Sequence, residues 1–126
     1  MNEFIKNRPR RFEQINQGSL HWYKVTGLQA HRGTGSEDEI IHFVRQTNAL
    51  NALEMATKKL RGWKRHRNNA SSTEITDDYE INELENLLRE LGFRWNYNEP
   101  LAINGWRNSG RGSFYINDLL NERMQQ

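Results

Sequence analysis

Residues 77–92, DDYEINELENLLRELG, carry the clearest secondary-structure pattern in the chain. Asp77, followed three residues later by Glu80, has the pattern of a capping box, in which two residues satisfy the free backbone amides at a helix start. Gly92 is the residue type that commonly ends a helix in the left-handed conformation. Between these limits, one helical face carries the apolar residues Ile81, Leu84, Leu88 and Leu91. The stretch therefore predicts an amphipathic helix whose apolar stripe needs a surface to cover.

A second helix is predicted upstream of this one. Thr47 or Asn48 can serve as the N-cap, and Gly62 is placed to end the helix. The apolar residues that recur at helical spacing are Ala49, Ala52, Leu53, Ala56 and Leu60. The last turn is rich in Lys and Arg, which complement the negative end of the helix dipole. These cations can therefore be explained by helix stability, without a ligand.

Strands are expected around these helices, because four segments are rich in aromatic and β-branched residues. The segment 20–30 and the segment 40–45 should form a hairpin across the polar loop 31–39. A third strand is predicted over 63–76 with a turn or bulge at Asn68-Asn69, and a fourth over 93–97, where aromatic and polar residues alternate.

The C-terminal part is expected to be less regular. Residues 104–113 are rich in glycine and are predicted to form a loop. Asn117 or Asp118 could then cap a last short helix that carries Leu119, Leu120 and Met124.

This element order predicts an α+β fold. We expect a small, mainly antiparallel sheet of about four strands, with the two main helices packed on one face and a short C-terminal helix. The other face would then be open, and an open face with Arg and aromatic residues resembles the platforms on which single-stranded bases stack. Residues 1–17 are expected to be a basic N-terminal arm, and residues 18–126 a single domain.

The composition excludes several classes of protein. The 126 residues include no cysteine, so disulfide frameworks, thiol nucleophiles and thiolate zinc sites are excluded, and a reducing compartment fits. No apolar run approaches the roughly 18 residues of a membrane span, and residues 1–17 are too polar for a signal peptide. We therefore expect a cytoplasmic protein without membrane contact.

The net charge of +2 conceals a strong separation of charge along the chain. Residues 58–67 carry +6, and residues 68–92, which include the predicted acidic helix, carry −6. Thirteen of the 18 basic residues are Arg, which suits bidentate contacts to phosphate or carboxylate and stacking on rings.

The basic block is the main candidate for a nucleic-acid interface. Six cations within ten residues, beside an indole, combine phosphate neutralisation with a stacking surface. The N-terminal arm and the Gly-Arg segment after Trp106 add further arginines to this hypothesis. The predicted nucleic-acid-binding residues are Lys58, Lys59, Arg61, Trp63, Lys64, Arg65, Arg67, Arg107, Arg111, Arg10 and Arg11. The alternative is that Trp63 is a core anchor and that the cations complement the helix dipole or pair with the acidic helix.

No pattern in the sequence indicates catalysis. Gly33-Thr34-Gly35 lacks the third glycine of a dinucleotide-binding turn, and no phosphate-binding loop with Gly-Lys-Ser or Gly-Lys-Thr occurs. The four His residues lack the helical spacing of a zinc site, and no nucleophile elbow frames a serine. We therefore assign no catalytic residue, metal or cofactor, and expect a non-enzymatic binding protein that contacts DNA, RNA or a nucleic-acid-binding protein complex.

A second hypothesis concerns the acidic helix. Glu80, Glu83 and Glu90 belong to a block of seven acids within 17 residues, and Glu83 and Glu90 are expected to face away from the apolar stripe. Such a surface could occupy a basic groove on a host defence or transcription assembly, as a compact inhibitor encoded by a phage or mobile element would. An amphipathic helix with a solvated acidic face explains the same pattern. The identity of the partner and the oligomeric state are left open by the sequence.

Overall fold

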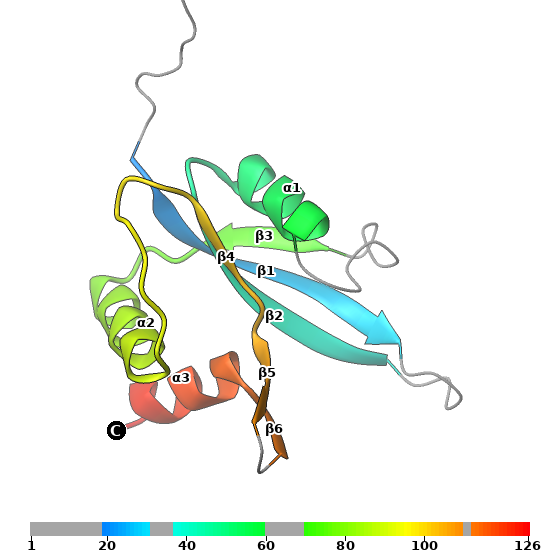
Figure 1. Cartoon of the computed structure of the whole chain (residues 1–126), viewed down its shortest axis with the longest axis vertical. Coiled ribbons are helices and arrows are strands. Elements are labelled where there is room, and N and C mark those ends of the chain that lie inside the picture. The colour runs from blue at the N-terminus through cyan, green and yellow to red at the C-terminus, as the bar shows by residue number, and fades with distance from the viewer. Residues whose placement is uncertain (1–18, 31–36, 60–69, 110–111) are drawn as a thin grey trace, which may run out of the picture.

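The computed structural model describes residues 19–30, 37–59, 70–109 and 112–126, and the predicted arm 1–17 lies outside these ranges. The described elements combine a four-stranded antiparallel sheet, a two-stranded hairpin and three helices, so the predicted α+β class is confirmed (Figure 1). In chain order they are β1 (His21–Ala30), β2 (Glu37–Gln46), α1 (Ala49–Lys59), β3 (Ser71–Glu74), α2 (Asp78–Glu90), β4 (Leu101–Ile103), β5 (Trp106–Ser109), β6 (Gly112–Tyr115) and α3 (Ile116–Met124).

The hairpin β1–β2 is the centre of the main sheet, whose strand order is β3-β1-β2-β4. Each of the two strands has ten residues, and they pair along their whole length, from His21 opposite Gln46 to Ala30 opposite Glu37. The predicted hairpin is thus confirmed, although β2 begins at Glu37, inside the expected loop. The edge strand β3 forms the end of the predicted third strand.

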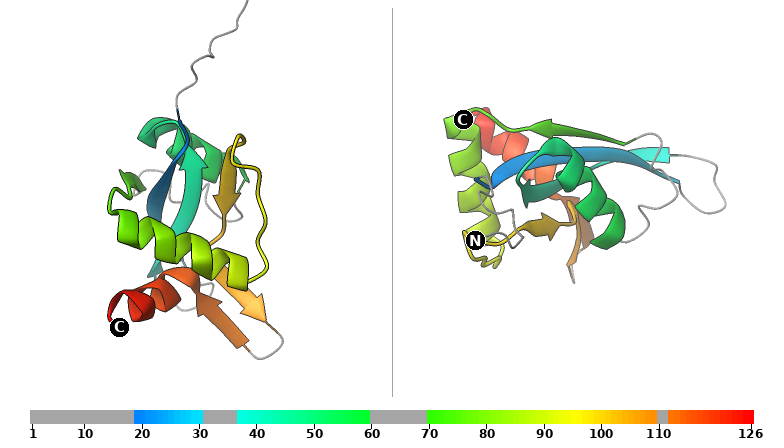
Figure 2. Two further views of the ribbon diagram at one scale, coloured as in Figure 1. Left: turned by 90° about the vertical axis from the view of Figure 1, so that its left-hand side faces the viewer. Right: turned by 90° about the horizontal axis from the view of Figure 1, so that it is seen from above.

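The sheet is covered on both faces, so the prediction that both main helices pack on one face is wrong. Neighbouring residues of a strand point to opposite faces. One face carries Trp22 and Phe43, which pack with residues of α2 and α3, and the other carries Tyr23 and Val44, which pack with α1. Because β1 and β2 are apolar on both faces, one layer of helices could not cover them. Figure 2 shows α2 and α3 lying together, away from α1.

Helix α2 follows its local sequence closely. The Asp77 side chain accepts a hydrogen bond from the Tyr79 amide at 3.2 Å, and Gly92 has a positive φ of 98° just after the helix. Leu84 and Leu88 of the predicted stripe are buried, and Ile81 and Leu91 pack against the core while partly exposed. Leu87, which was not predicted, is buried as well. The carboxylate of Glu80, expected to complete the capping box, instead binds Lys24 of β1.

Residues 93–97 do not form the predicted strand. They follow α2 without strand structure. Phe93 and Trp95 pack against the core, while Tyr97 is exposed. Trp95 lies edge-on to Trp22, with ring centroids 5.8 Å apart. The strand that extends the sheet beside β2 is β4, which comes later in the chain. In this pairing Ile103 lies opposite Phe43.

The predicted glycine-rich loop 104–113 contains strand β5 and the first two residues of β6, so that prediction is also wrong. Arg107 pairs with Phe114 in this hairpin. The chain enters α3 directly from β6, and the N-cap is Tyr115, whose side chain makes no capping hydrogen bond. The Ile116 amide donates to the Gly105 carbonyl at 2.7 Å, so a backbone contact takes the place of the expected cap by Asn117 or Asp118.

Candidate nucleic-acid interface

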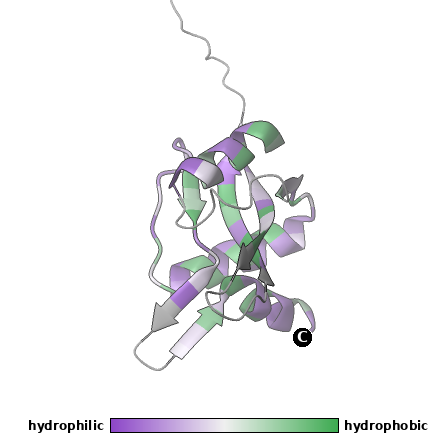
Figure 3. Ribbon diagram, turned by 90° about the vertical axis from the view of Figure 1, so that its right-hand side faces the viewer, coloured by the Kyte–Doolittle hydropathy of each residue, from purple (hydrophilic) through white to green (hydrophobic). Residues whose placement is uncertain are grey.

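Helix α1 presents two lysines at its C-terminal end. The helix starts at Asn48, whose Oδ1 accepts a hydrogen bond from the Asn51 amide at 2.8 Å, as one of the two predicted caps. Its small residues Ala52 and Ala56 are fully buried against the sheet, while Lys58 and Lys59 are exposed. Figure 3 shows the mixture of hydrophobic and hydrophilic residues along this helix.

The two lysines border a cavity of about 510 Å³. Neither lysine forms an ion pair with any residue in the part of the chain that the structure describes. Asn51, Met55 and Pro100 are among the other lining residues, together with Glu54 and Glu99. The two lysines thus have no ion pair among the described residues, and two carboxylates and apolar surface share the lining of this cavity with them.

Most of the other predicted interface residues lie outside the described ranges. They are Arg61, Trp63, Lys64, Arg65, Arg67, Arg10, Arg11 and Arg111. In the sequence, residues 60–67 follow directly after Lys59.

Arg107 is described, and it does not join the lysines. Its guanidinium lies 4.9 Å from the centroid of the Phe93 ring, and its side chain is exposed on β5. The hairpin β5–β6 and helix α1 lie at opposite ends of the molecule (Figures 1 and 2). Arg107 and Lys58 therefore belong to two separate surfaces.

Three glutamates of α2 are bound by cations from other elements. Glu80 binds Lys24 of β1 with an N···O distance of 2.7 Å. Glu83 and Glu90 both bind Arg123 of α3, the former at 3.7 Å. The two glutamates expected to face away from the apolar stripe thus reach toward α3, and all three candidate residues of the inhibitor hypothesis are paired within the fold.

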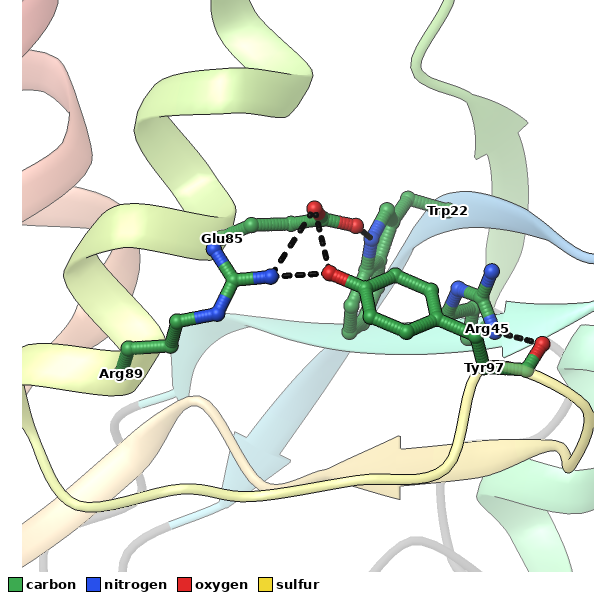
Figure 4. Close-up of polar contacts among 5 residues, drawn as sticks. All are labelled: Trp22, Arg45, Glu85, Arg89 and Tyr97. Atoms are coloured by element: carbon green, nitrogen blue, oxygen red, sulfur yellow. Dashed lines mark hydrogen bonds and ion pairs between the residues drawn. The ribbon is translucent and has the colours of Figure 1, made fainter.

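A polar network on the same helix was missed by the sequence analysis. The Trp22 indole donates to Glu85 at 2.8 Å, and the Tyr97 hydroxyl donates to the other oxygen of Glu85 at 3.2 Å. Arg89 reaches both Glu85 and the Tyr97 hydroxyl, while Arg45 donates to the Tyr97 carbonyl at 2.9 Å (Figure 4). The alternation of aromatic residues in 93–97 is the available signal in the sequence, but the same alternation is typical of a strand.

His42 is buried inside the sheet layer, where its role is structural. Its Nδ1 accepts a hydrogen bond from the Gly105 amide at 2.9 Å. Burial lowers the pKa of His42 to about 4, because the charged imidazolium would lose its hydration. Across the described ranges, no group of three or more His, Asp or Glu side chains is arranged to hold a metal ion.

No protein-family model matches the chain, and neither the curated proteins nor the solved structures contain a match. None of the helices in the described part of the chain has the length and apolar character needed to cross a membrane.

Proposed function

We propose that this chain is a small non-enzymatic protein that binds nucleic acid, with contact starting at the C-terminal end of α1. One observation supports this proposal above the others. Lys58 and Lys59 are exposed and have no carboxylate partner among the described residues, whereas the glutamates of α2 are paired with Lys24, Arg89 and Arg123. The glutamates of α2 are therefore paired with cations other than Lys58 and Lys59.

The chemistry of the contact would be neutralisation of backbone phosphates. Lysines act as point charges on phosphate oxygens, and each neutralised phosphate releases counterions, so the affinity should fall steeply with salt. The sequence after Lys59 adds four more cations and Trp63, an indole on which a base could stack. Arg107, on the separate hairpin surface, would make at most an auxiliary contact. The proposal includes a cytoplasmic location, which the lack of cysteine fits.

Fluorescence anisotropy tests this function directly. Labelled single- and double-stranded DNA and RNA are titrated with the full chain at two salt concentrations. We expect micromolar binding that weakens at the higher salt. Replacing Lys64, Arg65 and Arg67 by Ala should weaken binding and make the salt dependence shallower.

The matched control removes acidic charge from α2. The Glu83→Gln/Glu90→Gln variant should bind nucleic acid no more weakly than the original chain. Absence of binding by the folded protein at low salt would remove the proposed function. Loss of binding in the glutamate variant alone would contradict the assigned surface.

A further inference from the structure

Arg45 is a buried cation without a buried counter-charge. The residue is only 9% exposed, yet its guanidinium forms no ion pair with the described residues. Its single described hydrogen bond runs from Nη1 to the Tyr97 carbonyl, and the Tyr97 ring centroid lies 4.9 Å from the guanidinium carbon. Buried charges are costly unless they are paired. No guanidinium nitrogen of Arg45 is among the described atoms that are both fully buried and without a partner, so the donors that Tyr97 does not use are accessible from outside.

Arg45 lines a cavity of about 310 Å³ between β1, β2 and the start of α2. Arg45 and Trp22 line it from the sheet, and Glu74, Asp78 and Glu85 line it from β3 and α2. A guanidinium at the wall of such a cavity presents a fork that matches a carboxylate or phosphate. The size is at the lower end of the range for small-molecule sites.

The surrounding carboxylates narrow the choice of ligand. Glu85 is already occupied by Trp22, Tyr97 and Arg89, and Glu74 lies 3.5 Å from His21. The Asp78 side chain is exposed and forms no hydrogen bond or ion pair within the described part of the chain, so its carboxylate is available to a cationic group. Three nearby carboxylates repel a doubly charged phosphate. A ligand with one negative and one positive group can instead place the negative group on Arg45 and the positive group near Asp78.

We propose that this cavity binds a small zwitterion of the amino-acid class, with its carboxylate on Arg45 and its ammonium group toward Asp78. The proposal does not depend on nucleic-acid binding, because the cavity and the Lys58–Lys59 surface use different residues. It is the buried position of Arg45, rather than the acidic rim, that carries the proposal.

The test uses NMR titrations of the ¹⁵N-labelled full chain with a panel of L-amino acids. Acetate, methylammonium and inorganic phosphate serve as probes that carry only one kind of charge. We expect at least one amino acid to shift the Trp22 indole resonance and to bind about tenfold more tightly than any single-charge probe. If no amino acid shifts this resonance, or if acetate or phosphate binds as tightly, the proposal is overturned.

Two variants assign the binding to its residues. Arg45→Gln should weaken amino-acid binding by about tenfold or more, and Asp78→Asn should weaken it while leaving the buried arginine intact. Arg94→Gln is the matched control, because the Arg94 guanidinium is exposed and binds the Arg89 and Phe93 carbonyls. Unchanged binding in Asp78→Asn overturns the proposal even if Arg45→Gln does not fold. Arg45→Gln, where folded, should retain its affinity for nucleic acid.

Discussion

The two longer helices carry charge in opposite ways. Helix α2 places Glu80, Glu83 and Glu85 against cations or donors supplied by β1, α3 and the segment after α2. Helix α1 ends with Lys58 and Lys59 exposed and unpaired within the described ranges. Both helices belong to strongly charged blocks of the sequence, so block charge alone does not show which charges a partner can reach. Which charges are accessible depends on where cations from distant parts of the sequence, such as Lys24 and Arg123, lie in the fold.

The cores under the two helices differ as well. The α2 side contains large side chains, among them Trp22, Phe43 and Leu84, whereas α1 packs Ala52 and Ala56. Because buried apolar volume sets the cost of truncation, we expect the stability of the domain to depend more on the α2 side.

Truncation of neighbouring residues on β2 gives the largest expected effect. Phe43 and Val44 are both fully buried, but they point to the α2 and α1 sides of the sheet. Phe43→Ala should lower the free energy of unfolding by about 3–5 kcal/mol, and Val44→Ala by about 2 kcal/mol. Urea denaturation measures both values. Equal losses would contradict the asymmetry.

Acidification should destabilise the sheet through His42. Its pKa is about 4 in the folded chain, while an unfolded histidine has a pKa near 6.5. Between these values the unfolded state binds a proton that the folded state does not, so stability is lost as the pH falls from about 6.5 to 4, by about 3 kcal/mol. Chemical denaturation across this range should show a smaller loss for His42→Asn. Identical pH profiles for the two proteins would count against this assignment.

Two glycine substitutions should show how much stability is lost through a steric clash and how much through an unfavourable backbone φ. A Cβ on Gly105 would lie 1.7 Å from the Ile41 carbonyl oxygen, so Gly105→Ala must displace the turn after β4 and should cost about 2–3 kcal/mol. Gly92 has open space around its Cβ position and only a positive φ, so Gly92→Ala should cost about 1 kcal/mol. Thermal unfolding of both variants gives the comparison. A larger loss of stability in Gly92→Ala than in Gly105→Ala would show that the chain around Gly105 can make room for a Cβ beside the Ile41 carbonyl.

Local patterns were enough to predict the elements whose causes are local. The cap at Asp77 and the apolar stripe fixed α2, Asn48 marked the start of α1, and the dense β-branched and aromatic runs predicted the β1–β2 hairpin. Each of these depends on residues a few positions apart.

Features that depend on distant residues were not predicted. Residues 93–97 have a strand-like alternation, but the position beside β2 is occupied by β4, which comes later in the chain. The start of α3 is fixed by the Gly105 carbonyl, and the Trp22–Glu85 hydrogen bond joins residues 63 positions apart. Neither contact leaves a local pattern in the sequence.

The smallest expected effect on stability is at the end of α1. Lys58→Ala and Lys59→Ala should each change the free energy of unfolding by no more than about 0.5 kcal/mol, because neither side chain has a described ion pair. Arg123→Ala, which removes the partner of Glu83 and Glu90, should cost more. Urea denaturation checks both. A large loss in Lys58→Ala would mean that this lysine serves the fold.

The most direct test of binding at the C-terminal end of α1 is the salt dependence of nucleic-acid binding in two variants that each lose two positive charges. Lys58→Ala/Lys59→Ala removes unpaired lysines, and Lys24→Ala/Arg123→Ala removes cations that the fold already uses. Anisotropy titrations should show weaker binding and a log–log salt slope shallower by about 1.4 for single strands in the first variant. The second variant should bind like the original chain as long as it stays folded. Equal losses in the two variants would contradict the account, since binding would then follow net charge and not the end of α1.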